Sequence, residues 1–160
     1  MDIAKKAEHY KRYYSNSDGL TLQQLYDIVE KLDIELYEES FTELKGAYYY
    51  IERTKHIILD SGMDDIEKRF VLAHELGHAI LHRKENCFFK KKYTRLKVSY
   101  IEMEADEFAA NLLLPQDIPI DLQELNAEQL AMLYEVPLEL MQIKIETICH
   151  RKEGGITRLS

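Results

Sequence analysis

The segment from residue 64 to residue 83 constrains the fold most strongly, because its apolar residues recur at helical spacing. Within it lies the pentapeptide His74-Glu75-Leu76-Gly77-His78, a His-Glu-x-x-His motif. Residues i and i+4 of a helix lie one above the other on the same face, so two imidazoles placed in this way can reach a single Zn²⁺ at about 2.0–2.1 Å. The segment therefore predicts a helix that binds a metal ion.

Glu75 has a different position from the two histidines. It follows His74 directly, so its side chain lies beside the metal and does not share the direction of His74. Zinc lowers the pKa of a bound water to about 7, which makes a neighbouring carboxylate an adequate general base. A motif with only three fixed positions also occurs by chance. The alternative to a metal site is a helix that carries two surface or capping histidines.

A catalytic zinc needs a third protein ligand, and an acidic segment downstream supplies the candidates. Glu102 and Asp106 are i and i+4, so they share one face of a helix predicted to start near Ser99. Glu102 could bind zinc while Asp106 accepts the free N–H of a zinc-binding histidine. Glu104 lies about 200° further round the helix. Glu102 also fits as the capping-box carboxylate of its own helix, a role that it could not combine with zinc binding.

The rest of the chain predicts a single α+β domain over residues 1–150. Helical patterns cover residues 2–14, 22–32, 64–83 and 99–114, and two further helices follow from Asn126 and Pro137. A short strand is predicted around residues 34–36 and a hairpin over residues 47–60, whereas residues 84–98 are irregular and basic. We expect a small antiparallel sheet packed on a bundle of helices, with residues 151–160 as a flexible tail.

Composition excludes several classes of protein. The chain has 160 residues and a net charge of −8, which argues against non-specific binding to a phosphate backbone. No apolar run approaches the roughly 18 residues of a membrane-spanning helix, and no apolar stretch follows Met1 as in a signal peptide. Two cysteines, Cys87 and Cys149, cannot form a disulfide framework, so a cytoplasmic location is predicted.

Two segments together resemble the ImmA/IrrE family of bacterial and phage metallopeptidases. Residues 70–82, Phe-Val-Leu-Ala-His-Glu-Leu-Gly-His-Ala-Ile-Leu-His, resemble the active-site helix of that family. Residues 102–115, from Glu102 through Phe108-Ala109 to Leu113-Leu114-Pro115, resemble its second signature. The likeness extends over roughly residues 20–146 and implies a zincin-like pair of active-site helices of the Glu-zincin kind.

The resemblance implies a role for each matching residue. His74, His78 and Glu102 would bind zinc, Glu75 would be the catalytic acid and base, and Asp106 would support a histidine ligand. Glu104 is the alternative third ligand. Family members of this size resemble site-specific proteases that cleave a helix-turn-helix repressor of a prophage or mobile element. Two rival functions stay open: a zinc-containing anti-repressor that binds the repressor without cutting it, and a DNA-binding regulator.

Other residues have less specific patterns. His82 extends the i, i+4 series beyond His78, but packing near the helix end explains it better than a role on the metal. Tyrosines could stabilise an oxyanion, and the candidates are Tyr93, Tyr100 and the run Tyr48-Tyr49-Tyr50.

The hairpin could offer an edge strand to an extended substrate. The basic run Lys90-Lys91-Lys92, Arg95 and Lys97 suits a solvated loop better than a DNA contact, and the acidic helix near residue 139 makes direct nucleic-acid binding by residues 126–146 improbable.

Overall fold

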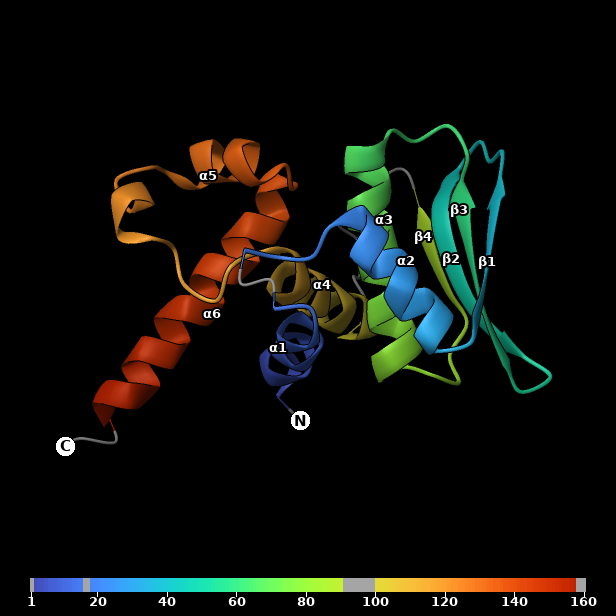
Figure 1. Cartoon of the computed structure of the whole chain (residues 1–160), viewed down its shortest axis with the longest axis horizontal. Coiled ribbons are helices and arrows are strands. Elements are labelled where there is room, and N and C mark those ends of the chain that lie inside the picture. The colour runs from blue at the N-terminus through green and yellow to red at the C-terminus, as the bar shows by residue number, and fades with distance from the viewer. Residues whose placement is uncertain (1, 16–17, 91–99, 158–160) are drawn as a thin grey trace.

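A computed structural model describes residues 2–15, 18–90 and 100–157, and its elements follow the predicted order of two helices, a sheet and further helices (Figure 1). The elements are α1 (Ile3–Tyr13), α2 (Leu22–Lys31), β1 (Ile34–Glu39), β2 (Leu44–Ile51), β3 (Thr54–Asp60), α3 (Asp65–Leu81), β4 (Cys87–Lys90), α4 (Tyr100–Leu113), α5 (Ala127–Tyr134) and α6 (Leu138–Thr157), with a 3₁₀ turn at Ile120–Leu122. The α+β class is confirmed. No helix in the described ranges is long and apolar enough to cross a membrane.

Local capping signals account for several helix starts. Thr21 accepts a hydrogen bond from the backbone of Gln24 and the Gln24 side chain accepts one in return, which completes the predicted capping box of α2. Asn126 and Gln129 form the same arrangement at the start of α5. The capping box predicted at Ser99 lies outside the described residues, because the description of α4 begins at Tyr100.

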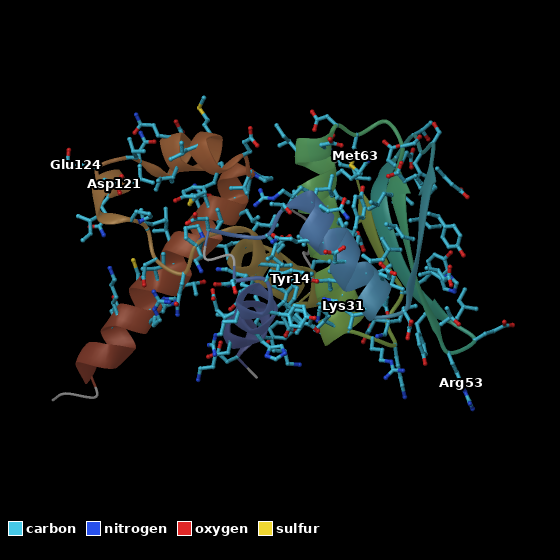
Figure 2. The ribbon with its side chains drawn as sticks, viewed as in Figure 1. Tyr14, Lys31, Arg53, Met63, Asp121 and Glu124 are labelled. Atoms are coloured by element: carbon cyan, nitrogen blue, oxygen red, sulfur yellow. The ribbon has the colours of Figure 1, made fainter. Side chains whose placement is uncertain are left out.

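The sheet has the strand order β1-β3-β2-β4 and is mixed, not purely antiparallel as predicted. The hairpin of β2 and β3 is antiparallel, and it turns through Glu52 and Arg53, both at positive φ, with Arg53 at the tip in Figure 2. β1 instead pairs in parallel with β3. The pairing of β2 with β3 in a hairpin was predicted and is confirmed, whereas the parallel pairing of β1 with β3 was not predicted, because it depends on contacts distant in sequence.

The strand β4 lies in a segment that was predicted to be irregular. It pairs with β2 and forms one edge of the sheet, while β1 forms the other. Both strands of the hairpin are therefore interior, so the expectation that the hairpin offers a free edge to a substrate is wrong. Among the described residues, the strands at the edges of the sheet are β1 and β4.

Helices α2 and α3 cover one face of this sheet, and α4 lies on the far side of α3 (Figure 1). Apolar side chains from the covered face, including Tyr48, Ile57 and Leu59, are completely buried together with Val71 and Leu72 of α3. Each fully buried side chain of this size contributes about 1.5–3 kcal/mol. This packing holds α3 between the sheet and α4.

The C-terminal helix α6 packs on α4, and α5 packs on α6. Leu140 and Met141 of α6 are buried, and α4 contacts both α1 and α6. This is the packing role preferred for residues 126–146 over a role in DNA binding. Helix α6 continues to Thr157, so most of the expected flexible tail is helical, and Arg151 in that part donates a hydrogen bond to the carbonyl of Gln116.

The carbonyl groups at the C-terminal end of α4 are satisfied by distant parts of the chain. The amide of Leu20 donates to the carbonyl of Leu112 at 3.1 Å. The guanidinium of Arg69 donates to Leu113 at 3.0 Å, and the ammonium of Lys11 donates to Leu114 at 2.6 Å. Helix ends leave such carbonyls without intrahelical partners, so these bonds fix the position of α4 relative to α1 and α3.

Candidate metal centre

The middle of α3 is buried on every side, which brings its polar residues into the interior. Asp64 caps the helix by accepting a hydrogen bond from the amide of Glu67 at 2.8 Å. All residues from Val71 to Ala79 are buried, and the exposed fractions of His74, Glu75 and His78 are 0%, 0% and 1%. Buried polar side chains of this kind require partners, and α4 supplies them to the two histidines.

A close contact between backbones sets the distance from α3 to α4. A side chain on Gly77 would place its Cβ 3.1 Å from both Cα and the carbonyl oxygen of Ala105, tighter than ordinary contacts. Glycine at this position therefore lets the two helices approach closely. As a result the residues on either side of Ala105 along α4 reach the histidines of α3.

Glu102 and the two histidines of the motif converge on one point. The Nε2 atoms of His74 and His78 are 3.1 Å apart. Carboxylate oxygens of Glu102 lie 3.0 Å from Nε2 of His74 and 3.2 Å from Nε2 of His78. Ligand atoms of a tetrahedral Zn²⁺ are about 3.3–3.4 Å apart, which follows from bonds of about 2.0–2.1 Å. The triangle of atoms is therefore close to the size that such an ion needs.

Asp106 supports this triangle from behind. Its Oδ1 lies 2.8 Å from Nδ1 of His74, and a carboxylate only accepts hydrogen bonds. The Nδ1 atom therefore donates to Asp106, and a metal ion would replace the proton on Nε2 of His74, which faces Glu102 and His78. A partner of this kind on the second ring nitrogen is typical of histidines that bind metals.

The charges around the triangle favour a cation at its centre. Burial lowers the pKa of His74, but its hydrogen bonds to Asp106 and Glu102 outweigh burial and raise that pKa to about 10. Burial likewise raises the pKa of Glu102, but the two histidines outweigh it and lower that pKa to about 2. The carboxylates thus stabilise positive charge at this place, and two neutral imidazoles with one carboxylate are a ligand set that Zn²⁺ accepts.

Glu75 is a buried carboxylate of the site that makes no hydrogen bond to the described part of the chain. Neither of its oxygens has a hydrogen-bond partner among the described residues. Burial raises the pKa of Glu75 to about 8; the charge of His74 acts against this, and the charges of Glu102 and Asp106 add to it. A Cβ on Gly46 of β2 would lie 3.1 Å from Oε1 of Glu75. The carboxylate therefore packs against the backbone of this glycine.

Two of the remaining candidates, Glu104 and Tyr48, contact groups outside this triangle. Glu104 lies with its Oε1 3.4 Å from Nε2 of His82, and it is Glu102 that joins the two histidines of the motif. The hydroxyl of Tyr48 donates to the carbonyl of Arg83, and Tyr100 is 75% exposed. The candidate Tyr93 and the basic run from residue 91 to residue 97 lie outside the described residues.

Sequence reasoning missed two contacts of the site. The i, i+4 spacing from His78 could have indicated that His82 contacts the ring of His78, whereas no local pattern indicates that Gly46 approaches Glu75.

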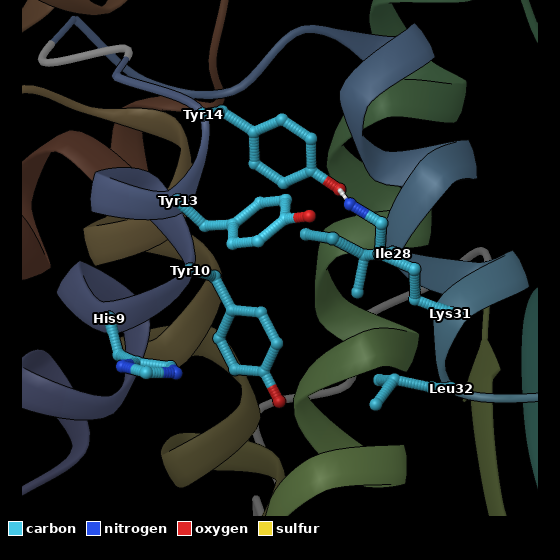
Figure 3. Close-up of a pocket in the computed structure, with 7 residues that line it drawn as sticks. All are labelled: His9, Tyr10, Tyr13, Tyr14, Ile28, Lys31 and Leu32. Carbon is cyan, nitrogen blue, oxygen red and sulfur yellow. Dashed lines mark hydrogen bonds between the residues drawn. The ribbon is translucent and has the colours of Figure 1, made fainter.

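A separate concavity lies between α1 and α2 (Figure 3). Its volume is about 110 Å³, and it is lined by His9, Tyr10, Tyr13, Tyr14, Ile28, Lys31 and Leu32. The ammonium of Lys31 lies 3.8 Å from the ring centre of Tyr13 and donates a hydrogen bond to the hydroxyl of Tyr14 at 3.4 Å. None of the residues of the candidate metal centre lines this pocket, so the two features are independent.

Comparison with known proteins agrees with the resemblance. A family model of peptidase M78, described as the IrrE N-terminal-like domain, matches residues 29–146. "Uncharacterized immunity region protein 2" of Bacillus phage phi105 is 38% identical over 104 residues, which cover 64% of this chain and 66% of the relative. "Metallopeptidase ImmA" of Bacillus subtilis (strain 168) is 24% identical over 128 residues, which cover 78% of this chain and 76% of the relative.

The matched region contains α3, α4 and every residue of the candidate metal centre. The match to the phage protein spans just under two thirds of that protein's own length. Because the family model covers most of the chain, the protein belongs to the peptidase M78 family of IrrE N-terminal-like domains.

Proposed function

We propose that this protein is a zinc-dependent endopeptidase that cleaves a helix-turn-helix repressor of a prophage or mobile element. The observation that carries the proposal is the convergence of His74, His78 and Glu102 beside Glu75, whose carboxylate has no hydrogen-bond partner among the described residues. The Bacillus subtilis relative named as a metallopeptidase supports the peptidase activity. The phage relative, named for an immunity region, supports a repressor as the substrate.

In this proposal His74, His78 and Glu102 hold the ion, with Asp106 keeping the ring of His74 in place. When bound, Zn²⁺ would polarise the scissile carbonyl and make a water more acidic. Three protein ligands leave a position open for such chemistry, as in catalytic rather than structural zinc sites. The side chain of Glu102 is 20% exposed, so the centre is accessible to solvent on that side.

Glu75 would move the proton of the reaction. Its carboxylate accepts a proton from the attacking water as the new C–O bond forms, and it returns that proton to the amide nitrogen as the C–N bond breaks. A group that is hydrogen-bonded to the protein would have to break that bond first, whereas the oxygens of Glu75 have no such bond in the described structure. General acid–base catalysis of this kind contributes typically 10²–10⁴-fold.

The test is to co-express the chain with the helix-turn-helix repressor encoded nearest its gene and to measure the intact mass of the repressor. We expect one defined pair of fragments with the wild type and with Glu146→Gln, a control that removes an exposed carboxylate on α6. With Glu75→Gln we expect the intact repressor.

Two outcomes would contradict the proposal. Fragments produced equally by Glu75→Gln would exclude the acid–base role of Glu75. An uncut repressor that is nevertheless captured and inactivated by both the wild type and Glu75→Gln would instead favour an anti-repressor that acts by binding.

A further inference from the structure

The row of contacts in the site continues beyond His78 to two side chains that the proposed reaction does not use. Nδ1 of His78 lies 3.1 Å from Nδ1 of His82, and Nε2 of His82 lies 3.4 Å from Oε1 of Glu104. The side chains of His82 and Glu104 are 8% and 18% exposed. This row, which we call the His82–Glu104 relay, is therefore largely shielded from water.

Both ends of the relay are held by the helices. His82 is the C-terminal cap of α3, and its backbone amide donates to the carbonyl of His78 at 2.7 Å. Its ring stands one helical turn beyond the ring of His78, which is the direction in which i and i+4 side chains meet. Glu104 precedes Ala105, the residue of α4 that packs against Gly77, so the close contact of the two helices also sets its distance from His82.

The geometry of the three groups allows an arrangement of hydrogen bonds that suits metal binding by His78. In this arrangement Nε2 of His82 donates a hydrogen bond to the carboxylate of Glu104. Nδ1 of His82 then accepts a hydrogen bond from Nδ1 of His78. Nε2 of His78 is left with its lone pair, which faces His74 and Glu102.

The relay thus does for His78 what Asp106 does for His74. Both supporting carboxylates come from α4, on either side of Ala105. Asp106 reaches its histidine directly at 2.8 Å, whereas Glu104 acts on His78 through the ring of His82. With a metal ion bound, the two arrangements together would leave both Nε2 atoms unprotonated and directed at one centre.

We propose that His82 and Glu104 are positioning residues that set the tautomer and the ring orientation of His78 for metal binding. The inference rests on the proposed zinc chemistry and deepens it. Outer partners of metal-binding histidines are typically worth about 10–100-fold in metal affinity, which is the size of effect that we expect here.

The test uses the purified full chain and measures zinc affinity by competition with a chromophoric chelator. His82→Phe keeps a ring of similar size but removes the acceptor, so we expect zinc affinity to fall by about 10–100-fold. The unfolding midpoint of the metal-free protein should stay near that of the wild type.

A second pair of variants keeps the proposal testable if His82→Phe folds poorly. Glu104→Gln retains a carbonyl oxygen that can accept from Nε2 of His82, so it should keep most of the zinc affinity. Glu104→Leu removes the acceptor and should lose more. Glu146→Leu, at an exposed position of α6, is the control for loss of a carboxylate and should bind zinc as the wild type does.

Two spectroscopic measurements separate positioning from direct binding. In the zinc-loaded wild type, ¹⁵N shifts of the imidazole nitrogens should show the proton of His82 on Nε2 and that of His78 on Nδ1. A proton on Nδ1 of His82 would overturn the proposal. In the Co²⁺-loaded protein, His82→Phe should leave the shape of the visible absorption band unchanged, and a changed shape would make His82 a ligand instead.

The possible failures can be told apart. If the wild type binds zinc and His82→Phe binds it equally tightly, the relay has no positioning role but the proposed peptidase chemistry stands. If the wild type binds no zinc, the proposed function fails and the inference fails with it.

Discussion

The two ends of α4 both face buried polar side chains, yet they differ in how those side chains are paired. At the C-terminal end, Arg69 and Lys11 donate to the last carbonyls of the helix. At the N-terminal end, Glu102 and Asp106 meet the histidines of α3, and Glu75 nearby has no hydrogen bond among the described residues. At the C-terminal end, which we call the matched end, buried donors and acceptors are paired. At the N-terminal end, which we call the unmatched end, carboxylates predominate.

This difference separates stabilising polar groups from functional ones. Unpaired buried polar atoms cost free energy, so a fold retains them only where another requirement outweighs stability. The matched end of α4 contributes to the free energy of unfolding, whereas the buried Glu75 beside the other end, with no hydrogen bond among the described residues, reduces it. Substitutions at the matched end should therefore lower stability more than activity. Substitutions at the unmatched end should lower activity more than stability.

The largest expected effect is on activity at the unmatched end. Glu75→Gln should lower the rate of repressor cleavage by about 10²–10⁴-fold, because the acid–base group is lost. The same change removes a buried carboxylate that has no hydrogen bond to the described protein, so the free energy of unfolding should not decrease. Single-turnover cleavage and urea denaturation of the metal-free protein check the two statements, and a clear loss of stability would break the comparison.

At the matched end, Arg69→Met should have its effect on stability. The guanidinium donates to the carbonyls of Leu20 at 2.8 Å and Leu113 at 3.0 Å, and hydrogen bonds of charged groups contribute about 1.5–3 kcal/mol each. Because methionine replaces part of the packing, we expect a loss of about 3 kcal/mol in urea denaturation. The control Arg12→Met, on the exposed surface of α1, should change stability by less than about 0.5 kcal/mol. A loss of similar size in the control would show that charge rather than pairing matters.

Gly46→Ala tests where the sheet meets the unmatched end. The added Cβ would lie 2.7 Å from Cγ1 of Val71 and 3.1 Å from Oε1 of Glu75. Overpacking of this kind costs about 1–3 kcal/mol, measured as a lower unfolding midpoint. The double variant Gly46→Ala with Val71→Ala relieves the contact with valine and should recover stability. The contact of the added Cβ with Glu75 remains in both variants, so the activity of both should be lower than that of the wild type. Full activity of the double variant would show that this contact has no consequence.

The smallest expected effect is a pH dependence at the matched end. Burial, and then the charge of Lys11, lower the pKa of Lys144 from 10.5 to about 8, although its ammonium donates to Asn111 at 2.8 Å. Between these two pKa values the unfolded chain binds more protons than the folded one, so stability rises with pH. From pH 8 to pH 9.5 the wild type should gain on the order of 1–2 kcal/mol relative to Lys144→Met. Parallel pH profiles of the two proteins would contradict this.

Much of the fold and of the site could be predicted from local patterns. The spacing of the apolar residues predicted α3 and the hairpin, and the capping box predicted the start of α2. The spacing of the motif predicted that His74 and His78 share one face, and the resemblance implied that Glu102 joins them, as the structure places it. Glu104, which the helical angle directed away from the centre, contacts His82 instead.

The sequence by itself determined those features that depend on neighbours within about one or two helical turns. These are the helix that bears the motif, the strands of the hairpin and the candidate ligands on each helix. Only the tertiary structure decided which elements become neighbours: β3 pairs with both β1 and β2, Gly46 lies against Glu75, and α4 brings Glu104 to His82. The physical reason is that hydrophobic periodicity records which face of an element is buried, whereas the partner on that face is selected by packing among segments distant in sequence.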